Sequence, residues 1–176
     1  MKKLYYTCME SPVGTLLLLG DGESLLMIDF HGGRDIRAEW TENRTPFEKV
    51  IVELKEYFQG ERKSFDVPVK PVGTPFQQKV WEKLFEIPYG ETVSYGGIAH
   101  RLGKPKAARA VGSACKSNPI PIIIPCHRVI GSNGNLTGFG GGLEIKRMLL
   151  SLESEMEMAK KNKKSGTVVL CGHRVM

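Results

Sequence analysis

The sequence predicts an α/β amino-terminal half followed by a mainly helical carboxy-terminal half. Residues 3–9, 14–20 and 24–30 are rich in apolar residues and are separated by turn-forming Pro, Gly, Ser and Asp. This pattern predicts three antiparallel strands. From residue 45 onward, apolar residues recur mostly at helical spacing. With 41% hydrophobic residues, a chain of 176 residues can bury a core and form one large domain or two small ones.

One helix is expected in the amino-terminal half. Thr45 can cap the free backbone N–H groups, Pro46 suits the first helical position, and Glu48 completes a capping box. The apolar side chains that follow share one helical face and are predicted to be core. They are Val50, Leu54, Tyr57 and Phe58. Residues 61–73 show little periodicity and are interpreted as a linker.

Two short helices joined by a tight turn are expected in the carboxy-terminal half, after a first capped helix that begins at Thr74. Ser94 caps the earlier of the two, over residues 95–102, and the second runs over residues 106–117. This is the layout of a helix-turn-helix, which is a DNA-binding motif in some proteins and only a packing unit in many. The second helix carries small residues and a single Arg109. That composition favours either close packing inside the protein or sequence-independent binding in a minor groove.

The strongest chemical signal is Cys126, which stands directly before His127 and Arg128. The apolar run 120–124 precedes it and has the β-branched content of a buried strand. Thiolate is the reactive form of cysteine, and neighbouring basic groups favour it, so Cys126 is a candidate nucleophile. The alternative is an inert cysteine that is simply buried.

A glycine-rich segment, residues 138–142, follows the cysteine. It is either a flexible linker or a loop that lets a flat ligand lie against the backbone, and its position after the cysteine favours the loop. A final amphipathic helix is predicted over residues 143–153. Its inward face is expected to hold Leu143, Met148, Leu149 and Leu152. Residues 156–176 are basic and are expected to form a solvated tail.

The net charge of +6 is concentrated in the second half of the chain. Residues 1–73 hold 10 basic and 12 acidic residues, residues 74–155 hold 10 and 6, and residues 156–176 hold 5 and 1. A basic second half favours a phosphate-bearing partner, although an excess of this size also fits an ordinary protein surface.

The cellular setting is expected to be cytoplasmic. No apolar segment reaches membrane-spanning length, no secretory signal precedes the first strand, and the four cysteines form no CxxC pair. Free thiols in a reducing compartment fit these observations. His31 has no partner ligands at zinc-like spacing, so no metal is predicted.

Several motifs in a fixed order strengthen the nucleophile hypothesis. They are TPFQ at 74–77, IPYGE at 87–91, VSY at 93–95, AARAVG at 107–112, NP at 118–119, IPCHRV at 124–129 and GGL at 141–143. With these motifs the sequence resembles the O6-alkylguanine-DNA alkyltransferases, also called methylated-DNA–protein-cysteine methyltransferases. The resemblance implies a ribonuclease H-like α/β domain over residues 1–72 and a winged helix-turn-helix domain over residues 73–155.

The resemblance also implies a reaction. As a monomer, the protein would bind double-stranded DNA in the minor groove, flip out an O6-alkylguanine and transfer its alkyl group to Cys126 without a cofactor. O4-alkylthymine is a further expected substrate. A thioether has no good leaving group, so Cys126 would not be regenerated and each molecule would react once.

Roles for individual residues follow from the family by position. His127 would take the thiol proton, Glu153 would orient His127, and Tyr95 would donate a proton to the departing guanine. Arg109 would fill the space left by the flipped nucleotide, and Asn118 would tie the helix-turn-helix to the cysteine loop. The other expected DNA- and base-binding residues are Ala108, Ala110, Ser113, Cys115, Val129, Phe139, Gly140 and Gly141, with Arg128 as structural support.

Three positions depart from parts of the family. Phe139 stands where many members have Tyr, Gly140 where some have Ser, and Cys115 where some have a larger apolar residue. These changes affect the size of the alkyl group that the pocket accepts, but leave the expected reaction intact.

Two other functions are compatible with parts of the pattern. A non-catalytic sensor of alkylated DNA is disfavoured, because that branch of the family replaces the cysteine, commonly by Trp. A cysteine hydrolase using Cys126 and His127 would leave the helix-turn-helix unexplained, and adjacent residues of a strand point to opposite faces.

Overall fold

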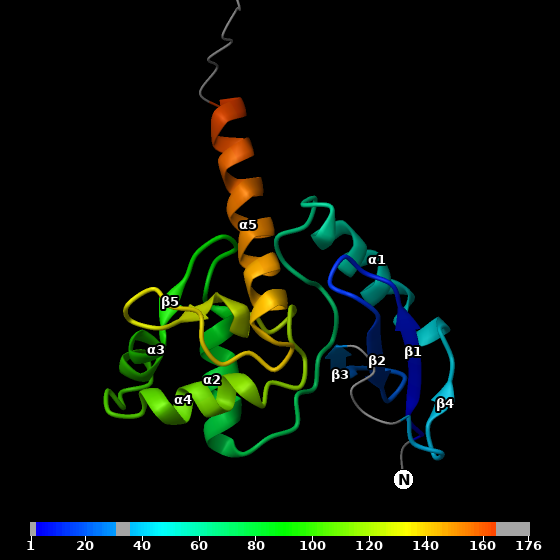
Figure 1. Ribbon diagram of the computed structural model, residues 1–176. Coiled ribbons are helices and arrows are strands. Elements are labelled where there is room, and N and C mark those ends of the chain that lie inside the picture. The colour runs from blue at the N-terminus through cyan, green and yellow to red at the C-terminus, as the bar shows by residue number, and fades with distance from the viewer. Residues whose placement is uncertain (1–2, 31–35, 165–176) are drawn as a thin grey trace, which may run out of the picture.

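The computed structural model describes residues 3–30 and 36–164, which form an amino-terminal sheet with one long helix and a carboxy-terminal helical part (Figure 1). The amino-terminal elements are β1 (Tyr5–Met9), β2 (Leu16–Gly20), β3 (Leu25–Phe30), β4 (Thr41–Glu42), the 3₁₀ helix η1 (Thr45–Phe47) and α1 (Glu48–Phe58). The carboxy-terminal elements are α2 (Pro75–Phe85), β5 (Val93–Ser94), α3 (Tyr95–Arg101), α4 (Ala108–Lys116), the 3₁₀ helix η2 (Cys126–Arg128), β6 (Val129–Ile130) and α5 (Leu143–Lys164).

The sheet has the strand order β3-β2-β1-β4. The three predicted strands are confirmed, and each pairs antiparallel with its neighbour in sequence. The fourth strand, β4, was not predicted; it is two residues long and pairs in parallel with β1. So short a segment carries no readable alternation of apolar and polar residues, which is why the sequence pattern did not reveal it.

The central strand β2 is buried on both of its faces. Leu16 and Leu18 pack in the main core with Leu54 of α1, whereas Leu17 and Leu19 belong to a second small cluster on the opposite face. Successive side chains of a strand point to opposite faces, so a run of four leucines fills both layers. Two of the four leucines therefore pack into the apolar layer on one face of the sheet, and two into the layer on the other face.

The start of the helix α1 differs from the prediction. The Thr45 side chain caps no helix. Its backbone N–H instead donates to Asn43 Oδ1. The chain then passes through η1 before α1 begins at Glu48. Pro46 suits the tighter turn because it needs no N–H partner there. The predicted core face of α1 is confirmed for Val50, Leu54 and Tyr57.

The helix-turn-helix is formed by α3 and α4. Ser94 caps α3 as predicted, accepting a hydrogen bond from Gly97 N–H, and Thr74 caps α2 in a complete capping box with Gln77. Helix α2 supports α4 through the indole of Trp81, whose Nε1–H donates to the carbonyl of Ala114 at 2.9 Å. Helix α4 is therefore held from behind by a buried aromatic side chain.

The run 120–124 is not a strand, contrary to the prediction. It forms a tight turn in which Ile124 N–H donates to the Ile120 carbonyl at 2.9 Å, and Ile122 adopts φ +75°. Proline at 119, 121 and 125 removes backbone donors on both sides, so a sheet ladder cannot form there. The five residues are nevertheless fully buried, which explains their apolar character.

The last helix is longer than predicted. Helix α5 continues through Lys164 rather than ending near Glu153, so residues 156–164 are not the expected solvated tail; residues 165–176 lie outside the described residues. The carboxy-terminal half of α5 projects past the rest of the protein (Figure 1). Two predicted core positions of α5 are also wrong, because one lies at the start of the helix and the other on its outer side. Leu143 and Met148, predicted to face inward, are exposed, as is Phe85 at the end of α2, while Leu149 is buried as expected.

We predict that Gly73→Ala destabilises the protein by about 1–3 kcal/mol, as overpacking does. A Cβ at residue 73 would stand 2.4 Å from Trp81 Cη2, on the ring that supports α4. The matched control is Gly96→Ala, where the nearest atom is 3.9 Å away and alanine favours the helix by about 0.5–1 kcal/mol. Urea unfolding of both variants tests this, and equal free energies of unfolding would contradict it.

Candidate active site

Cys126 begins the 3₁₀ turn η2, immediately before β6. It is only 2% exposed, and the short turn places His127 and Arg128 in the interior beside it. Prolines prevent a regular strand before the turn, so consecutive side chains need not point to opposite faces as they would in an extended chain. Three adjacent functional residues can therefore serve one site.

His127 is paired with Glu153 of α5. Its Nε2 atom lies 2.7 Å from Glu153 Oε1, and both side chains are essentially unexposed. We assign the ring proton to Nε2, since a carboxylate needs a donor there. The other ring nitrogen, Nδ1, is buried without a hydrogen-bond partner among the described residues. A neutral imidazole with this tautomer has a free lone pair at Nδ1, which is the atom that can accept a proton.

Glu153 is bonded from several elements at once. Arg128 holds it with two hydrogen bonds, Nε to Oε2 at 2.9 Å and Nη2 to Oε1 at 3.0 Å, while Nη1 donates to the Ile87 carbonyl at 2.7 Å. Gly90 N–H donates to Oε2 at 3.0 Å, and the Tyr57 hydroxyl donates to Oε1 at 2.7 Å. Arg128 therefore bonds a backbone carbonyl and also fixes the carboxylate.

Burial alone would raise the pKa of Glu153, but the hydrogen bond and charge of His127, together with those of Arg128, outweigh it and lower this pKa to about 2. Burial lowers the pKa of His127, despite the opposing hydrogen bond to Glu153. At neutral pH the pair is accordingly a neutral imidazole on an ionised carboxylate. Such a histidine can take up a proton and have its positive charge stabilised at once.

Burial raises the pKa of the Cys126 thiol to about 11, against the hydrogen bond from Asn118 and the charge of Lys146. The resting thiol is therefore protonated. Because the thiolate is the nucleophilic form of cysteine, chemistry at this thiol would need a base, and the buried histidine next in sequence is a candidate for it.

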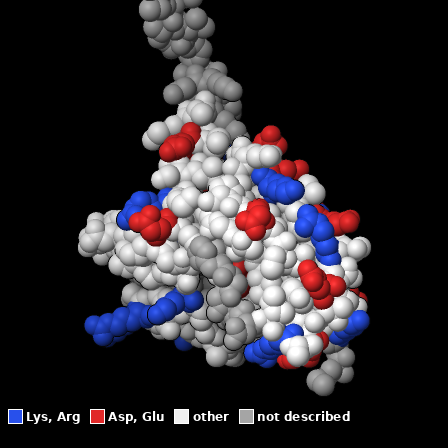
Figure 2. Space-filling model, turned by 45° about the vertical axis from the view of Figure 1, so that its right-hand side comes forward, with Lys and Arg blue, Asp and Glu red and all other residues white. Residues whose placement is uncertain are grey.

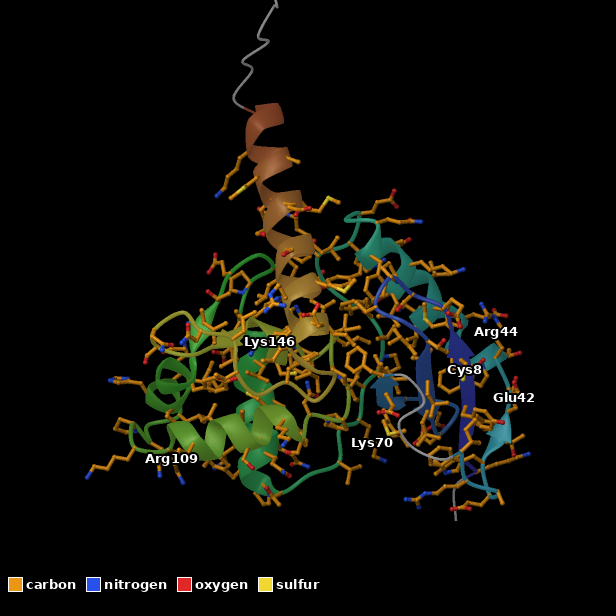
Figure 3. The ribbon with its side chains drawn as sticks, viewed as in Figure 1. Cys8, Glu42, Arg44, Lys70, Arg109 and Lys146 are labelled. Atoms are coloured by element: carbon orange, nitrogen blue, oxygen red, sulfur yellow. The ribbon has the colours of Figure 1, made fainter. Side chains whose placement is uncertain are left out.

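Lys146 of α5 is a buried lysine that the sequence reasoning did not single out. Its Nζ atom donates to the Val129 carbonyl at 2.5 Å, to the Thr137 carbonyl at 2.8 Å and to the Tyr95 hydroxyl at 3.3 Å. Figure 3 shows it inside the protein at the base of α5. The Tyr95 hydroxyl in turn donates to the Thr137 carbonyl at 2.6 Å, and burial raises the pKa of Tyr95. Tyr95 therefore stays protonated, as a proton donor must.

Asn118 joins the end of α4 to the cysteine turn. Its Nδ2 donates to the Ile124 carbonyl at 2.8 Å, and its Oδ1 accepts from Ile120 N–H at 3.0 Å. Both bonds close the turn that presents Cys126. Asn118 therefore links the end of α4 to the turn that carries Cys126.

A cavity of about 130 Å³ opens onto Cys126. The glycine-rich segment supplies one wall, and Cys115 is buried within the same lining. The pocket residues expected from the resemblance that meet here are Cys115, Asn118, Cys126, Phe139, Gly140 and Gly141. The cavity also contacts β3, residues 27–30, which no sequence signal had connected with the site. The Val129 carbonyl bonds Lys146 and keeps its second lone pair for another donor.

The expected DNA-binding residues lie on the outer face of α4. Arg109, Ala110 and Ser113 are exposed, and Ala108 is partly exposed. Arg109 points away from the body of the protein in Figure 3. In contrast, the face seen in Figure 2 carries acidic and basic side chains interspersed rather than a single basic field. Asn118, just after the end of α4, connects this helix to the turn that carries Cys126.

Two functional residues were missed for different reasons. Tyr57 looked like an ordinary core position of α1, and its bond to Glu153 joins residues that are 96 apart in sequence. Lys146 offered a faint signal, since it lies three residues before Leu149 and seven before Glu153 and so shares their buried helical face. A charged residue in a buried helical stripe deserves a search for partners.

Two further findings concern what the described part of the chain lacks. Within residues 3–30 and 36–164, no group of three His, Cys, Asp or Glu side chains could hold a metal ion. In the same part, no helix is both long and apolar enough to cross a membrane. His31 lies outside the described residues.

A buried thiol beside a histidine–glutamate pair, on a fold with an exposed helix-turn-helix, defines a protein that uses a cysteine in chemistry at DNA. Family profiles agree. The profile described as "6-O-methylguanine DNA methyltransferase, ribonuclease-like domain" matches residues 4–71, and "6-O-methylguanine DNA methyltransferase, DNA binding domain" matches residues 75–155.

Individual relatives agree as well. Methylated-DNA–protein-cysteine methyltransferases of Methanosarcina acetivorans and Haemophilus influenzae are each 53% identical, the first over 85% of this chain and 98% of the relative, the second over 87% and 88%. The crystal structure of Mycobacterium tuberculosis O6-methylguanine methyltransferase has a TM-score of 0.81 at 47% identity, covering 87% of this chain and 94% of that one. A structure of the Mycobacterium tuberculosis protein in complex with DNA has a TM-score of 0.82 at 49% identity, covering 86% and 94%. The chain belongs to the 6-O-methylguanine DNA methyltransferase family.

We predict that Glu153→Gln removes an acid-dependent part of the stability. The pKa of Glu153 is lowered on folding, so its stabilisation is complete above its unfolded value near 4.5 and is lost as pH falls toward about 2. The difference in unfolding free energy between wild type and variant should shrink by about 2 kcal/mol between pH 6 and pH 3. Urea titrations at both pH values measure it.

The control for this experiment is Glu155→Gln, an exposed residue two positions along α5. Its difference from wild type should stay nearly constant over the same pH range. A constant difference for Glu153→Gln as well would show that the carboxylate is not held ionised by its neighbours.

Proposed function

We propose that this chain repairs DNA by transferring the alkyl group of O6-alkylguanine irreversibly to Cys126. O4-alkylthymine is included as a substrate, since it carries the same alkyl–oxygen bond. The observation that carries the proposal is Cys126 itself, a buried thiol in the lining of a cavity and next to a neutral histidine whose Nδ1 has no hydrogen-bond partner among the described residues. Membership of the family supports the same reaction.

The transfer is a single displacement at carbon. The thiol proton passes to Nδ1 of His127, through a bridging water, and the resulting positive charge is stabilised by Glu153. The thiolate attacks the alkyl carbon, a sulfur–carbon bond forms, and the carbon–oxygen bond breaks. The guanine leaves as an anion and takes a proton at its ring from the Tyr95 hydroxyl. The atoms balance without a cofactor.

Lys146 supports the proton transfer from Tyr95. Its ammonium group lies 3.3 Å from the Tyr95 hydroxyl, so it stabilises the phenolate that forms as the proton leaves. The Tyr95 hydroxyl gives up its proton readily only when the guanine anion is present to accept it. Lys146 thus assists proton donation without contacting the alkyl group.

The target atom lies inside a duplex, so the nucleotide must be flipped into the cavity. The exposed small residues Ala110 and Ser113 let α4 approach the minor groove closely, and Arg109 enters the stack where the nucleotide has left. The backbone carbonyls of Cys126 and Val129 accept bonds from the base amino group. The exposed face of α4 has few side chains that could read base edges, so the affinity for DNA comes mainly from phosphate contacts and depends on the salt concentration.

The product is a thioether, which has no leaving group for a second displacement, so each molecule reacts once. Cys8, Cys115 and Cys126 are free thiols, and consumption of a reduced cysteine fits a cytoplasmic setting. In this proposal the protein acts as a monomer, with residues 1–72 and 73–155 as its two domains. Residues 156–176 form a basic segment to which we assign no role.

We predict that a duplex containing one O6-methylguanine adds a single methyl group to the Cys126 peptide. Intact and peptide mass spectrometry should show modification that saturates at one per protein. Cys126→Ser should remain unmodified, whereas Cys115→Ser should still be methylated at Cys126. Binding of the damaged duplex without any modification of the wild type would instead identify a sensor.

We predict that Arg109→Ala slows methyl transfer from duplex DNA roughly ten- to a hundredfold, as loss of about 1–3 kcal/mol of a specific contact does. Transfer from the free base O6-benzylguanine needs no nucleotide flipping and should change by less than about twofold. Arg101→Ala, which removes another exposed charge from the helix-turn-helix, controls for the loss of phosphate attraction. Equal effects of both variants on the duplex reaction would rule out the intercalating role.

A further inference from the structure

The amino-terminal half takes part in the cavity, although the proposed reaction uses only carboxy-terminal groups around Cys126 apart from Tyr57. Strand β3 is one of the two edge strands of the four-stranded sheet and is its strand nearest the helical part (Figure 1). Its residues 27–30 line the same cavity as Cys126 and the glycine-rich segment. The cavity therefore has one wall that belongs to a different domain.

Strand β3 contacts two other parts of the cavity lining. Ile28 N–H donates to the carbonyl of Pro119 at 2.9 Å, next to Asn118. The ring of Phe30 packs on the ring of Phe139, with centroids 5.7 Å apart and an interplanar angle of 54°. Both rings are buried, at 8% and 7% exposure. A tilted aromatic pair of this kind stabilises the contact beyond its buried area.

Phe30 also limits the glycine-rich segment directly. A Cβ placed on Gly141 would stand 2.6 Å from Phe30 Cδ2, so the backbone of this segment lies in van der Waals contact with the ring. Phe139, Gly140 and Gly141 all line the cavity. The segment cannot move outward at this point unless Phe30 moves first.

The cavity is small for the substrates that an alkyltransferase can meet. It measures about 130 Å³. A cavity of roughly 150 Å³ is needed for a single benzene ring, so the ring of a benzyl group alone needs about as much room as the whole cavity, in addition to the space that the base occupies. A benzyl group therefore requires the wall formed by Phe139 to move outward.

We propose that Phe30 is a specificity-determining residue that limits the size of the alkyl group by holding Phe139 and Gly141 against the cavity. This inference rests on the proposed alkyl transfer to Cys126. Phe30 is a positioning residue, since it acts through the wall rather than on the reacting atoms. The amino-terminal domain thereby sets the substrate range of a reaction that takes place in the other domain.

The test compares single-turnover rates on two duplexes of identical sequence, one with O6-methylguanine and one with O6-benzylguanine. In Phe30→Leu the ratio of the benzyl to the methyl rate should rise about tenfold or more, the scale on which a change in pocket size discriminates. The matched control is Phe47→Leu, the same change at a ring that is 2% exposed in the amino-terminal core and is not part of the cavity lining. Its ratio should stay within about twofold of wild type.

A rise of the same size in both variants, or in neither, overturns the inference. Methyl transfer by the wild type is measured in the same experiment, so a failure of the proposed reaction is distinguished from a failure of the role of Phe30. Phe30→Met keeps nearly the same volume with a flexible side chain and replaces Phe30→Leu if the latter does not fold.

A second measurement uses Gly141→Ala. In the wild-type background the added Cβ meets the Phe30 ring and should slow transfer from both duplexes. In the Phe30→Leu background the same change should cost less, because the obstructing ring is gone. Strictly additive effects of the two changes would show that Phe30 does not hold the segment, and would also overturn the inference.

Discussion

The structure depends on one buried carboxylate. Glu153 is 1% exposed, and its two oxygens accept hydrogen bonds from Tyr57, Gly90, His127 and Arg128. A buried charge without such partners costs several kcal/mol, so the arrangement is stable only when all of these groups are present together. Because they come from α1, from the loop before β5, from η2 and from α5, a single carboxylate joins both halves of the fold at the reactive centre.

The same carboxylate allows the site to be stable at rest, with a thiol and a neutral imidazole, and reactive after a proton has moved. Burial keeps Cys126 as a thiol and His127 as a neutral imidazole, so the site holds no thiolate that stray electrophiles could consume. Once a proton moves to His127, the ionised Glu153 beside it stabilises the charged imidazolium. A protein that reacts only once gains from a nucleophile that becomes active mainly when its substrate is in place.

The two domains cooperate more closely than a division into a scaffold and a catalytic part suggests. The amino-terminal half carries no chemical motif, yet it supplies Tyr57 to the carboxylate and places β3 along the cavity. The carboxy-terminal half supplies the thiol, the proposed base and the helix that we propose faces DNA. The contact between the domains is therefore part of the active site rather than a separate packing interface.

Local sequence signals determined much of this protein. They identified three strands, the caps at Thr74 and Ser94, the helix-turn-helix, and Cys126 with its neighbours, because each depends on residues close together in the chain. They failed at residues 120–124, where prolines outweigh β-branched character, and at the isolated two-residue strand β4. They also misplaced the end of α5, which continues as a helix beyond the predicted boundary.

Only the tertiary structure decided which distant groups complete the site. His127 and Glu153 are 26 residues apart and Tyr57 and Glu153 are 96 apart, so no local pattern links them. Resemblance alone had pointed to Glu153. Lys146 and Phe30 had the appearance of ordinary helix and strand residues. The role of a buried charge or ring depends on the partners that folding places around it. Hydrogen bonds between segments far apart in the chain produce no periodic pattern in the sequence, so the sequence does not predict them.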